Sequence, residues 1–218
     1  MRQIKIGNKW TFDDYGLWLA PDPSIEEATP KTHYVDIPFG NGSIDLTEAL
    51  TGEVVYENRL IKFGLVLPAD VSQWDGIRKQ LTNEIHGRKL EIVMPQYPYY
   101  IFKGRLSVGR LKEDNSVATI PVTAEAEPFM LKEDLTYLKK TIPAGGTLTL
   151  QLENERMTTL PVFSSTAEVQ LVFKSKTYTH SAGTFQNAGI LLTEGTNTLK
   201  INAAAGTVIE IEYQEGSL

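Results

Sequence analysis

The segment DIPFGNGSIDLTEALTGEVVYEN (36–58) sets the character of the N-terminal half, because it separates two stretches that read as strands, 33–37 and 59–67. Its residues are mostly small, polar or turn-prone, and Asn41-Gly42 is typical of a primed β-turn. A connection of this length inside a compact domain is uncommon unless it packs on something else. We therefore predict an extended loop or hairpin arm at 36–58 that lies outside the core of its domain.

The sequence around this segment predicts strands and one helix. Short runs with partial alternation of apolar and polar residues indicate strands at 3–6, 17–19, 33–37, 59–67, 90–94, 104–111 and 117–127. Apolar residues spaced by three and four predict a helix with one apolar face, formed by Val71, Trp74, Ile77, Leu81 and Ile85. Asp70 precedes this run as an expected N-cap, and Gly87 follows it as an expected helix end.

The C-terminal part of the chain has a different composition and reads as strands only. It holds 13 threonines in residues 141–218, against 9 in residues 1–140, and no Asp or Trp. Strands are expected at 147–152, 168–173, 177–181, 189–192, 198–201 and 208–213. Pro143 and Gly145-Gly146 punctuate the junction, as is typical of a domain boundary. We therefore expect two domains and a linker. Residues 1–133 form a β-sandwich with one helix and the arm, residues 134–146 form the linker, and residues 147–218 form a second β-sandwich or jelly roll.

Composition excludes several classes of protein. The 218 residues include 21 Lys and Arg against 27 Asp and Glu, so the net charge is −6, which disfavours binding to nucleic acid or to an anionic membrane surface. There is no cysteine, which removes disulfides, thiolate metal sites and cysteine nucleophiles. No apolar run is long enough for a transmembrane helix, and the N-terminus lacks the apolar region of a signal peptide.

We find no residue pattern that predicts catalysis, a cofactor or a metal. His33, His86 and His180 are far apart in the sequence, so no zinc-type spacing exists, and each is expected to be a surface or capping residue. The chain has no G-x-S-x-G nucleophile elbow, no glycine-rich phosphate loop followed by lysine, and no calcium-binding loop. We therefore expect no catalytic, cofactor-binding or metal-binding residues, no cofactor, and no enzymatic activity. A glycosidase would need two carboxylates that meet only in the fold, and it ranks last among the hypotheses.

One aromatic cluster allows two interpretations. Tyr97, Tyr99, Tyr100 and Phe102 lie among Pro95 and Pro98. Tyrosine-rich loops are common at interfaces and in sugar-stacking sites, whereas strand-end aromatics also cover sandwich edges or pack on a helix. The second interpretation is the favoured one, and the first leaves a carbohydrate-binding module open as an alternative.

Several short motifs together match a known family. They are DIP (36–38), NGSIDLTE (41–48), YENR (56–59) and PF (128–129), with EGTN (194–197) and the strand at 208–213 in the second half. On these residues the sequence resembles the distal tail protein family (Dit) of long-tailed bacteriophages and of prophages in Gram-positive bacteria. The helix that carries Trp74 follows at the position where the family has one. The second half is similar to the galectin-like C-terminal domain of that family.

The resemblance implies a structural role. Distal tail proteins form a hexameric ring at the virion tail tip, in the baseplate, where the first domain builds the ring and the second decorates its outside. The implied partners are other copies of the chain, the tail tube protein, the tail-associated hub protein and, in some phages, a receptor-binding protein that acts in host adsorption. The alternative is a carbohydrate-binding module for host envelope glycans, in which the C-terminal sandwich binds sugar through aromatic residues such as Tyr178 or the cluster at 97–100.

Overall fold

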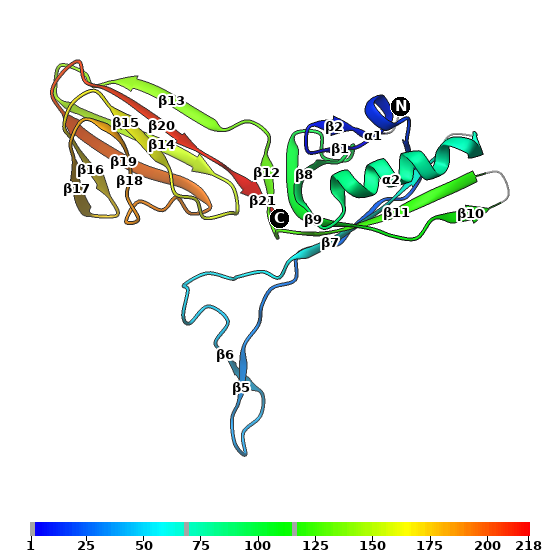
Figure 1. Cartoon of the computed structure of the whole chain (residues 1–218). Helices are drawn as coiled ribbons and strands as arrows, with labels where there is room; N and C mark the ends of the chain where they lie inside the picture. The colour runs from blue at the N-terminus through cyan, green and yellow to red at the C-terminus, as the bar shows by residue number, and fades with distance from the viewer. Residues whose placement is uncertain (1–2, 68–69, 115–116) are drawn as a thin grey trace. The chain divides into compact units, whose positions relative to one another are not determined.

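The computed structural model describes residues 3–67, 70–114 and 117–218. The chain divides into two compact units, Met1–Met130 and Leu131–Leu218, and each has its own apolar core. Figure 1 traces the strands and helices of both units. Within the described part of the chain, no helix is long and apolar enough to cross a membrane. The mainly β class expected from the sequence is confirmed.

The first unit is built on one antiparallel sheet in the order β2-β1-β8-β9-β11-β7-β3, to which β4 adds at β7 and β10 adds at β11. In β7 the buried Ile61, Phe63 and Leu65 alternate with less buried residues, because one face of the sheet covers the core. The strands are β1 (Lys5–Ile6), β2 (Lys9–Trp10), β3 (Trp18–Leu19), β4 (Ser24–Ile25), β7 (Arg59–Val66), β8 (Lys89–Val93), β9 (Tyr100–Val108), β10 (Lys112–Asp114) and β11 (Val117–Ala126).

The expected helix is confirmed as η1 (Val71–Gln73), a 3-10 turn, followed by α2 (Trp74–Ile85). Trp74, Leu81 and Ile85 are buried in the first core, and Ile77 packs against it partly buried. Val71 is instead 65% exposed, because it belongs to the 3-10 turn, whose three-residue repeat does not continue the apolar face of α2.

Both ends of this helical segment use the residues expected from the sequence. The side chain of Asp70 accepts hydrogen bonds from the Ser72 hydroxyl at 2.7 Å and from the Ser72 amide at 3.0 Å, and these bonds lower the pKa of Asp70. Gly87 has a φ of +74°, in the left-handed region that glycine adopts most readily after a helix. A short second helix, α1 (Thr11–Tyr15), lies between β2 and β3.

A carboxylate on α2 ties the helix to the N-terminal strands and α1. The Oε2 atom of Glu84 accepts hydrogen bonds from the Lys9 ammonium at 2.6 Å and from the Tyr15 hydroxyl at 2.5 Å. The bonds from Lys9 and Tyr15 lower the pKa of Glu84, while burial and the bond to Glu84 raise the pKa of Tyr15. The ionised form of Glu84 therefore stabilises the folded first unit.

We expect Glu84→Gln to lower the free energy of unfolding by about 1 kcal/mol at neutral pH, because a charge-assisted contact is replaced by a neutral one. Since the folded-state pKa of Glu84 lies below its usual 4.5, its contribution is present above pH 4.5 and is lost as the pH falls through the folded value. Urea titrations at several pH values should show the gap between the wild type and the variant closing below pH 4.5. A gap that is constant from pH 7 to pH 3 would contradict this role.

The second unit is a sandwich of two four-stranded antiparallel sheets, in the orders β13-β20-β15-β18 and β14-β19-β16-β17. In β20 the buried Ile209, Ile211 and Tyr213 alternate with Glu210 and Glu212, as expected from the sequence. Its galectin-like character stays a prediction. The strands of these two sheets are β13 (Thr136–Thr141), β14 (Thr147–Asn154), β15 (Val162–Ser165), β16 (Val169–Phe173), β17 (Lys176–His180), β18 (Gly183–Gln186), β19 (Gly195–Ala203) and β20 (Val208–Tyr213). Two short strands outside both sheets, β12 (Met130–Lys132) and β21 (Gly216–Ser217), pair with each other.

Two expectations for this half are wrong. The range 134–146 is not a linker throughout, because β13 (Thr136–Thr141) lies inside it and pairs with β20 along its whole length. This strand is at a sheet edge and carries mostly exposed Thr and Lys, so it lacks the apolar alternation of a strand. The range 189–192 is not a strand either. Its Ile190 and Leu192 are buried from an irregular segment, and Leu192 makes a single bridge with Thr159.

Candidate functional site

A two-stranded hairpin overlaps the arm predicted at 36–58 but begins earlier, because the strand expected at 33–37 is the first strand of the hairpin and not part of the main sheet. Strands β5 (Tyr34–Asp36) and β6 (Ser43–Asp45) pair antiparallel and form a sheet separate from that of the first unit. Along the chain the hairpin and its flanking segments lie between β4 and β7, and Figure 1 shows them leading into the start of β7. We call residues 31–57 the arm.

The turn of the hairpin differs from the expected primed turn at Asn41-Gly42. Six residues, 37–42, connect the paired residues Asp36 and Ser43. Phe39 has a φ of +60° and Gly42 a φ of +78°, and the Gly40 amide donates to the Ile37 carbonyl at 3.0 Å. A two-residue turn would need both strands to extend to Asn41-Gly42, but Pro38 has no amide hydrogen to donate to that pairing.

Backbone hydrogen bonds close the base of the arm. Pro30 and Tyr56 form a β-bridge, the Lys31 amide donates to the Val55 carbonyl at 2.8 Å, and the Glu57 amide donates to the Thr29 carbonyl at 2.8 Å. The arm is therefore a defined element whose two ends are held side by side.

A buried arginine anchors the chain where the arm enters β7. Arg59 is 3% exposed, its guanidinium donates to the Pro128 carbonyl, and its charge lies 5.7 Å from the centre of the Phe102 ring. Burial lowers the pKa of Arg59, partly offset by the attraction of Glu27. Beside it, the rings of Tyr56 and Phe129 meet edge to face at 5.8 Å. The root of the arm is thus packed on its own unit.

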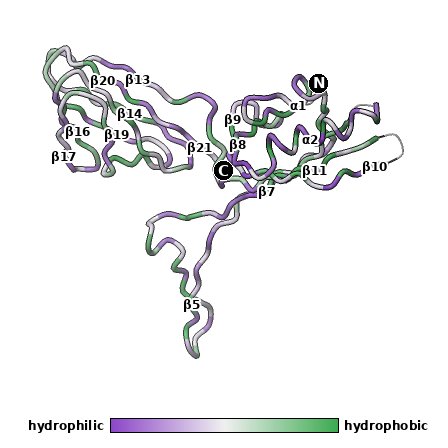
Figure 2. Tube along the Cα trace, in the orientation of Figure 1, coloured by the Kyte–Doolittle hydropathy of each residue, from purple (hydrophilic) through white to green (hydrophobic). Residues whose placement is uncertain are grey.

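The arm itself carries large apolar side chains that the described chain leaves partly or fully exposed. Each of them is more than a third exposed, and Phe39 and Leu50 are fully exposed. Hydrophobic residues recur along the whole length of the arm (Figure 2). The eight are Tyr34, Val35, Ile37, Phe39, Ile44, Leu46, Leu50 and Val55. Burying one such side chain contributes about 1.5–3 kcal/mol, so a surface of this kind is typical of a protein–protein contact.

The arm is also acidic. It has five acidic residues, Asp36, Asp45, Glu48, Glu53 and Glu57, and one basic residue, Lys31, so its net charge is −4. Asp45 is used locally, because its carboxylate accepts a hydrogen bond from the Thr47 amide at 2.9 Å, and its bonds with Thr47 lower its pKa. Glu48 is exposed. The arm therefore presents apolar side chains interspersed with negative charge.

The histidines lie apart, and two of them make structural contacts through their rings. His33 is exposed on the arm, the ring of His86 accepts a hydrogen bond from the Val108 amide at 2.9 Å, and His180 stacks on Phe185 at 4.0 Å. In the residues that the structure describes, no group of three or more histidines and carboxylates could hold a metal ion.

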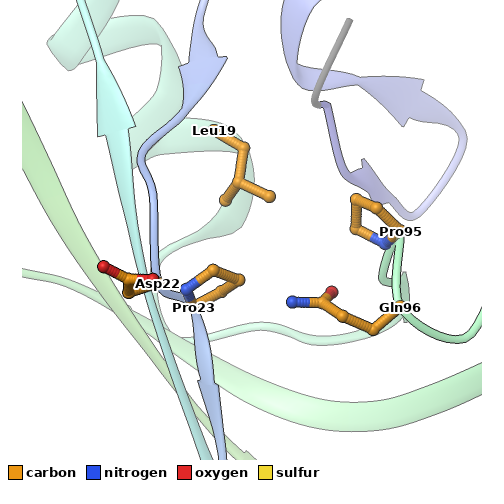
Figure 3. Close-up of a pocket in the computed structure, with 5 residues that line it drawn as sticks. All are labelled: Leu19, Asp22, Pro23, Pro95 and Gln96. Carbon is orange, nitrogen blue, oxygen red and sulfur yellow. The ribbon is translucent and has the colours of Figure 1, made fainter.

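The first unit has a shallow pocket of about 380 Å³. In Figure 3, Leu19, Asp22 and Pro23 lie on one side and Pro95 and Gln96 on the other. Asp22 is the single ionisable group among these five lining residues. A lone carboxylate among prolines lacks the second acid or base that glycoside hydrolysis requires.

The aromatic cluster does not form a sugar-stacking platform. Phe102 is fully buried, and the ring of Tyr97 packs edge to face on it at 5.8 Å. Tyr100 is half-buried against the same core, which leaves Tyr99 exposed. Tyr178 packs on the second core, and its hydroxyl donates to the Gly189 carbonyl at 3.2 Å. The interpretation of these rings as packing residues therefore agrees with the structure.

The fold and the arm together define a two-domain, mainly β protein with an uncovered apolar hairpin. No protein-family model matches the sequence, and no curated protein is similar to it. Among solved structures, the chain is similar to Dit (gp 19.1) of phage SPP1, with a TM-score of 0.71 and 11% sequence identity over 100% of both chains. SPP1 Dit is described as a paradigm of the hub adsorption apparatus in phages that infect Gram-positive bacteria. The distal tail protein fold implied by the sequence resemblance is confirmed.

Proposed function

We propose that this chain is a structural component of a phage tail tip, in which six copies form a closed ring and contact one another through their arms. The observation that carries the proposal is the arm with its eight exposed apolar side chains, of which Phe39 and Leu50 are fully exposed. The shared fold with SPP1 Dit supports a place in an adsorption apparatus. The role is that of a scaffold without enzymatic activity.

A closed ring would explain why the chain carries an exposed arm. An arm that binds a different surface on the next copy makes a head-to-tail contact, and such contacts close into a ring when the rotation between copies allows it. In this proposal the first unit forms the ring, which joins the tail tube protein to the tail-associated hub protein. The second unit, outside the ring, is the part available to a receptor-binding protein.

Removing the outer part of the arm tests the proposal. We expect a chain that lacks residues 40–52, joined by a short Gly-Ser linker, to remain folded and to lose the hexamer entirely, because the deletion removes Ile44, Leu46 and Leu50. Light scattering after size exclusion measures the assembly state, and thermal melting measures folding. A hexamer that persists without residues 40–52 would refute the role of the arm.

A milder variant separates the loss of contacts from any effect of the deletion on the chain. Phe39 and Leu50 are fully exposed, so replacing both by serine removes no packing within the described chain. We expect Phe39→Ser with Leu50→Ser to leave the melting temperature unchanged and to raise the concentration needed for assembly.

A further inference from the structure

An asparagine followed by a glycine, Asn41-Gly42, lies in the turn of the arm. It is the only such pair in the sequence, because a residue with a side chain follows each of the other eight asparagines. Both residues are exposed, and they directly precede β6, which begins at Ser43. The pair is therefore a solvent-accessible dipeptide at the end of a turn that joins two paired strands.

The structure leaves room for the Asn41 side chain to approach the Gly42 nitrogen. A Cβ atom placed on Gly42 would meet no atom within 4 Å, so the space on that side of the backbone is open. Among the described residues the Asn41 carboxamide has no hydrogen-bond partner. The Asn187 carboxamide, which precedes the small Ala188, is instead held in place, because its oxygen accepts a hydrogen bond from the Gly189 amide at 2.8 Å.

We propose that Asn41 is a site of spontaneous deamidation, in which the Gly42 nitrogen attacks the side-chain carbonyl carbon of Asn41. The nitrogen loses its proton and bonds to Cγ, and the Cγ–Nδ2 bond breaks to release ammonia. Water then opens the resulting five-membered succinimide at either carbonyl and gives aspartate or isoaspartate. Nucleophile and carbonyl belong to adjacent residues, and glycine has no side chain to obstruct ring closure, so the reaction needs no co-reactant besides water.

The product changes the arm in two ways. The new carboxylate is ionised at neutral pH, so the net charge of the arm goes from −4 to −5. Isoaspartate also routes the backbone through the former side chain, which inserts an additional carbon atom into the connection between the paired Asp36 and Ser43. At this pair the Ser43 hydroxyl donates to the Asp36 carboxylate at 2.9 Å, so the modification lies beside a contact that closes the turn.

Peptide mapping of the purified full-length chain tests this site. The chain is incubated at mildly alkaline pH, at a concentration at which light scattering shows only monomer, and is then digested with trypsin at mildly acidic pH. The tryptic peptide that contains Asn41 begins after Lys31 and ends at Arg59. We expect Asn41 to convert to the acid at least about tenfold faster than any other asparagine, which corresponds to about 1.4 kcal/mol in activation free energy. Fragmentation by electron transfer should identify isoaspartate as well as aspartate in the product.

Two matched glycine substitutions separate the chemistry of the pair from a general effect on the arm. Gly42 has a φ of +78° and Gly52 a φ of +75°, and a Cβ atom would meet nothing within 4 Å at either position. Alanine therefore introduces similar backbone strain at both. We expect Gly42→Ala to slow the conversion of Asn41 by about tenfold, because its methyl group obstructs ring closure. Gly52→Ala, which follows Thr51, should leave the rate unchanged.

The same measurements define the results that would overturn the proposal. They are an Asn41 that converts no faster than the other asparagines, a product that is aspartate alone, which indicates direct hydrolysis of the side-chain amide, and equal rates in Gly42→Ala and Gly52→Ala. Melting temperatures of both variants establish that the first unit remains folded. The reaction needs a single copy of the chain, so a failure of the proposed ring to form would leave this prediction unchanged.

Discussion

Phe163→Ala is expected to destabilise the second unit by about 3–5 kcal/mol, the range measured for removing a buried phenylalanine. Phe163 is fully buried on β15, paired with Phe185 of β18 and Ile211 of β20. Its ring stacks on that of Phe185 at 5.6 Å between centroids. Because a small domain has a total stability of about 5–15 kcal/mol, the loss would bring this unit close to unfolding.

The neighbouring ring provides a matched control for this prediction. Phe185 is half-buried on an edge strand, so Phe185→Ala is expected to cost less than Phe163→Ala. Urea unfolding followed by circular dichroism measures both. Equal losses for the two variants would mean that the sandwich does not depend on Phe163 as its central contact.

Phe102→Ala is expected to destabilise the first unit by a similar amount, about 3–5 kcal/mol. Phe102 is fully buried on β9. The centre of its ring lies 5.8 Å from the centre of the Tyr97 ring and 5.7 Å from the guanidinium of Arg59. Removing the ring leaves Arg59 buried beside a cavity. Since Arg59 lies at the root of the arm, we expect this variant to weaken assembly of the proposed ring as well.

Two variants distinguish the effect of the new cavity from the effect of losing the arginine contact. Phe102→Leu keeps much of the volume but no aromatic face, and should cost less stability than Phe102→Ala. Tyr99→Ala, at the exposed ring of the same cluster, should leave both stability and assembly unchanged. Unfolding titrations in which Phe102→Ala matches the wild type would contradict the place given to this ring in the core.

Regular patterns in the sequence were sufficient to predict most of the helices and strands. The spacing of Trp74, Ile77, Leu81 and Ile85 predicted α2, because the buried face of a helix repeats every three to four residues. The alternation of apolar and acidic residues in β20 predicted a half-buried strand, because successive side chains of a strand point to opposite faces of the sheet. Asp70 and Gly87 marked the ends of the helical segment through local backbone chemistry.

Features set by tertiary contacts were not predictable in this way. Strand β13 carries Lys139 and Lys140 at a sheet edge, and its apolar partner face is supplied by β20 about 70 residues later in the sequence. The six-residue turn of the arm follows from Pro38 and from the left-handed Phe39, which the Asn41-Gly42 signal obscured.

The candidate site was predicted as a segment but not as a surface. Length and turn composition located the arm, whereas the exposure of Phe39 and Leu50 appears only in the structure, because apolar residues in a sequence are expected to be buried.

The central claim is that the chain forms a closed ring of six copies. Native mass spectrometry of the purified full-length chain, recorded over a range of concentrations, tests this most directly. The proposed ring predicts a species at six times the protomer mass of 24.3 kDa, with few intermediates between monomer and hexamer. A chain that remains monomeric at every concentration, or that grows into an open series of oligomers, would contradict it.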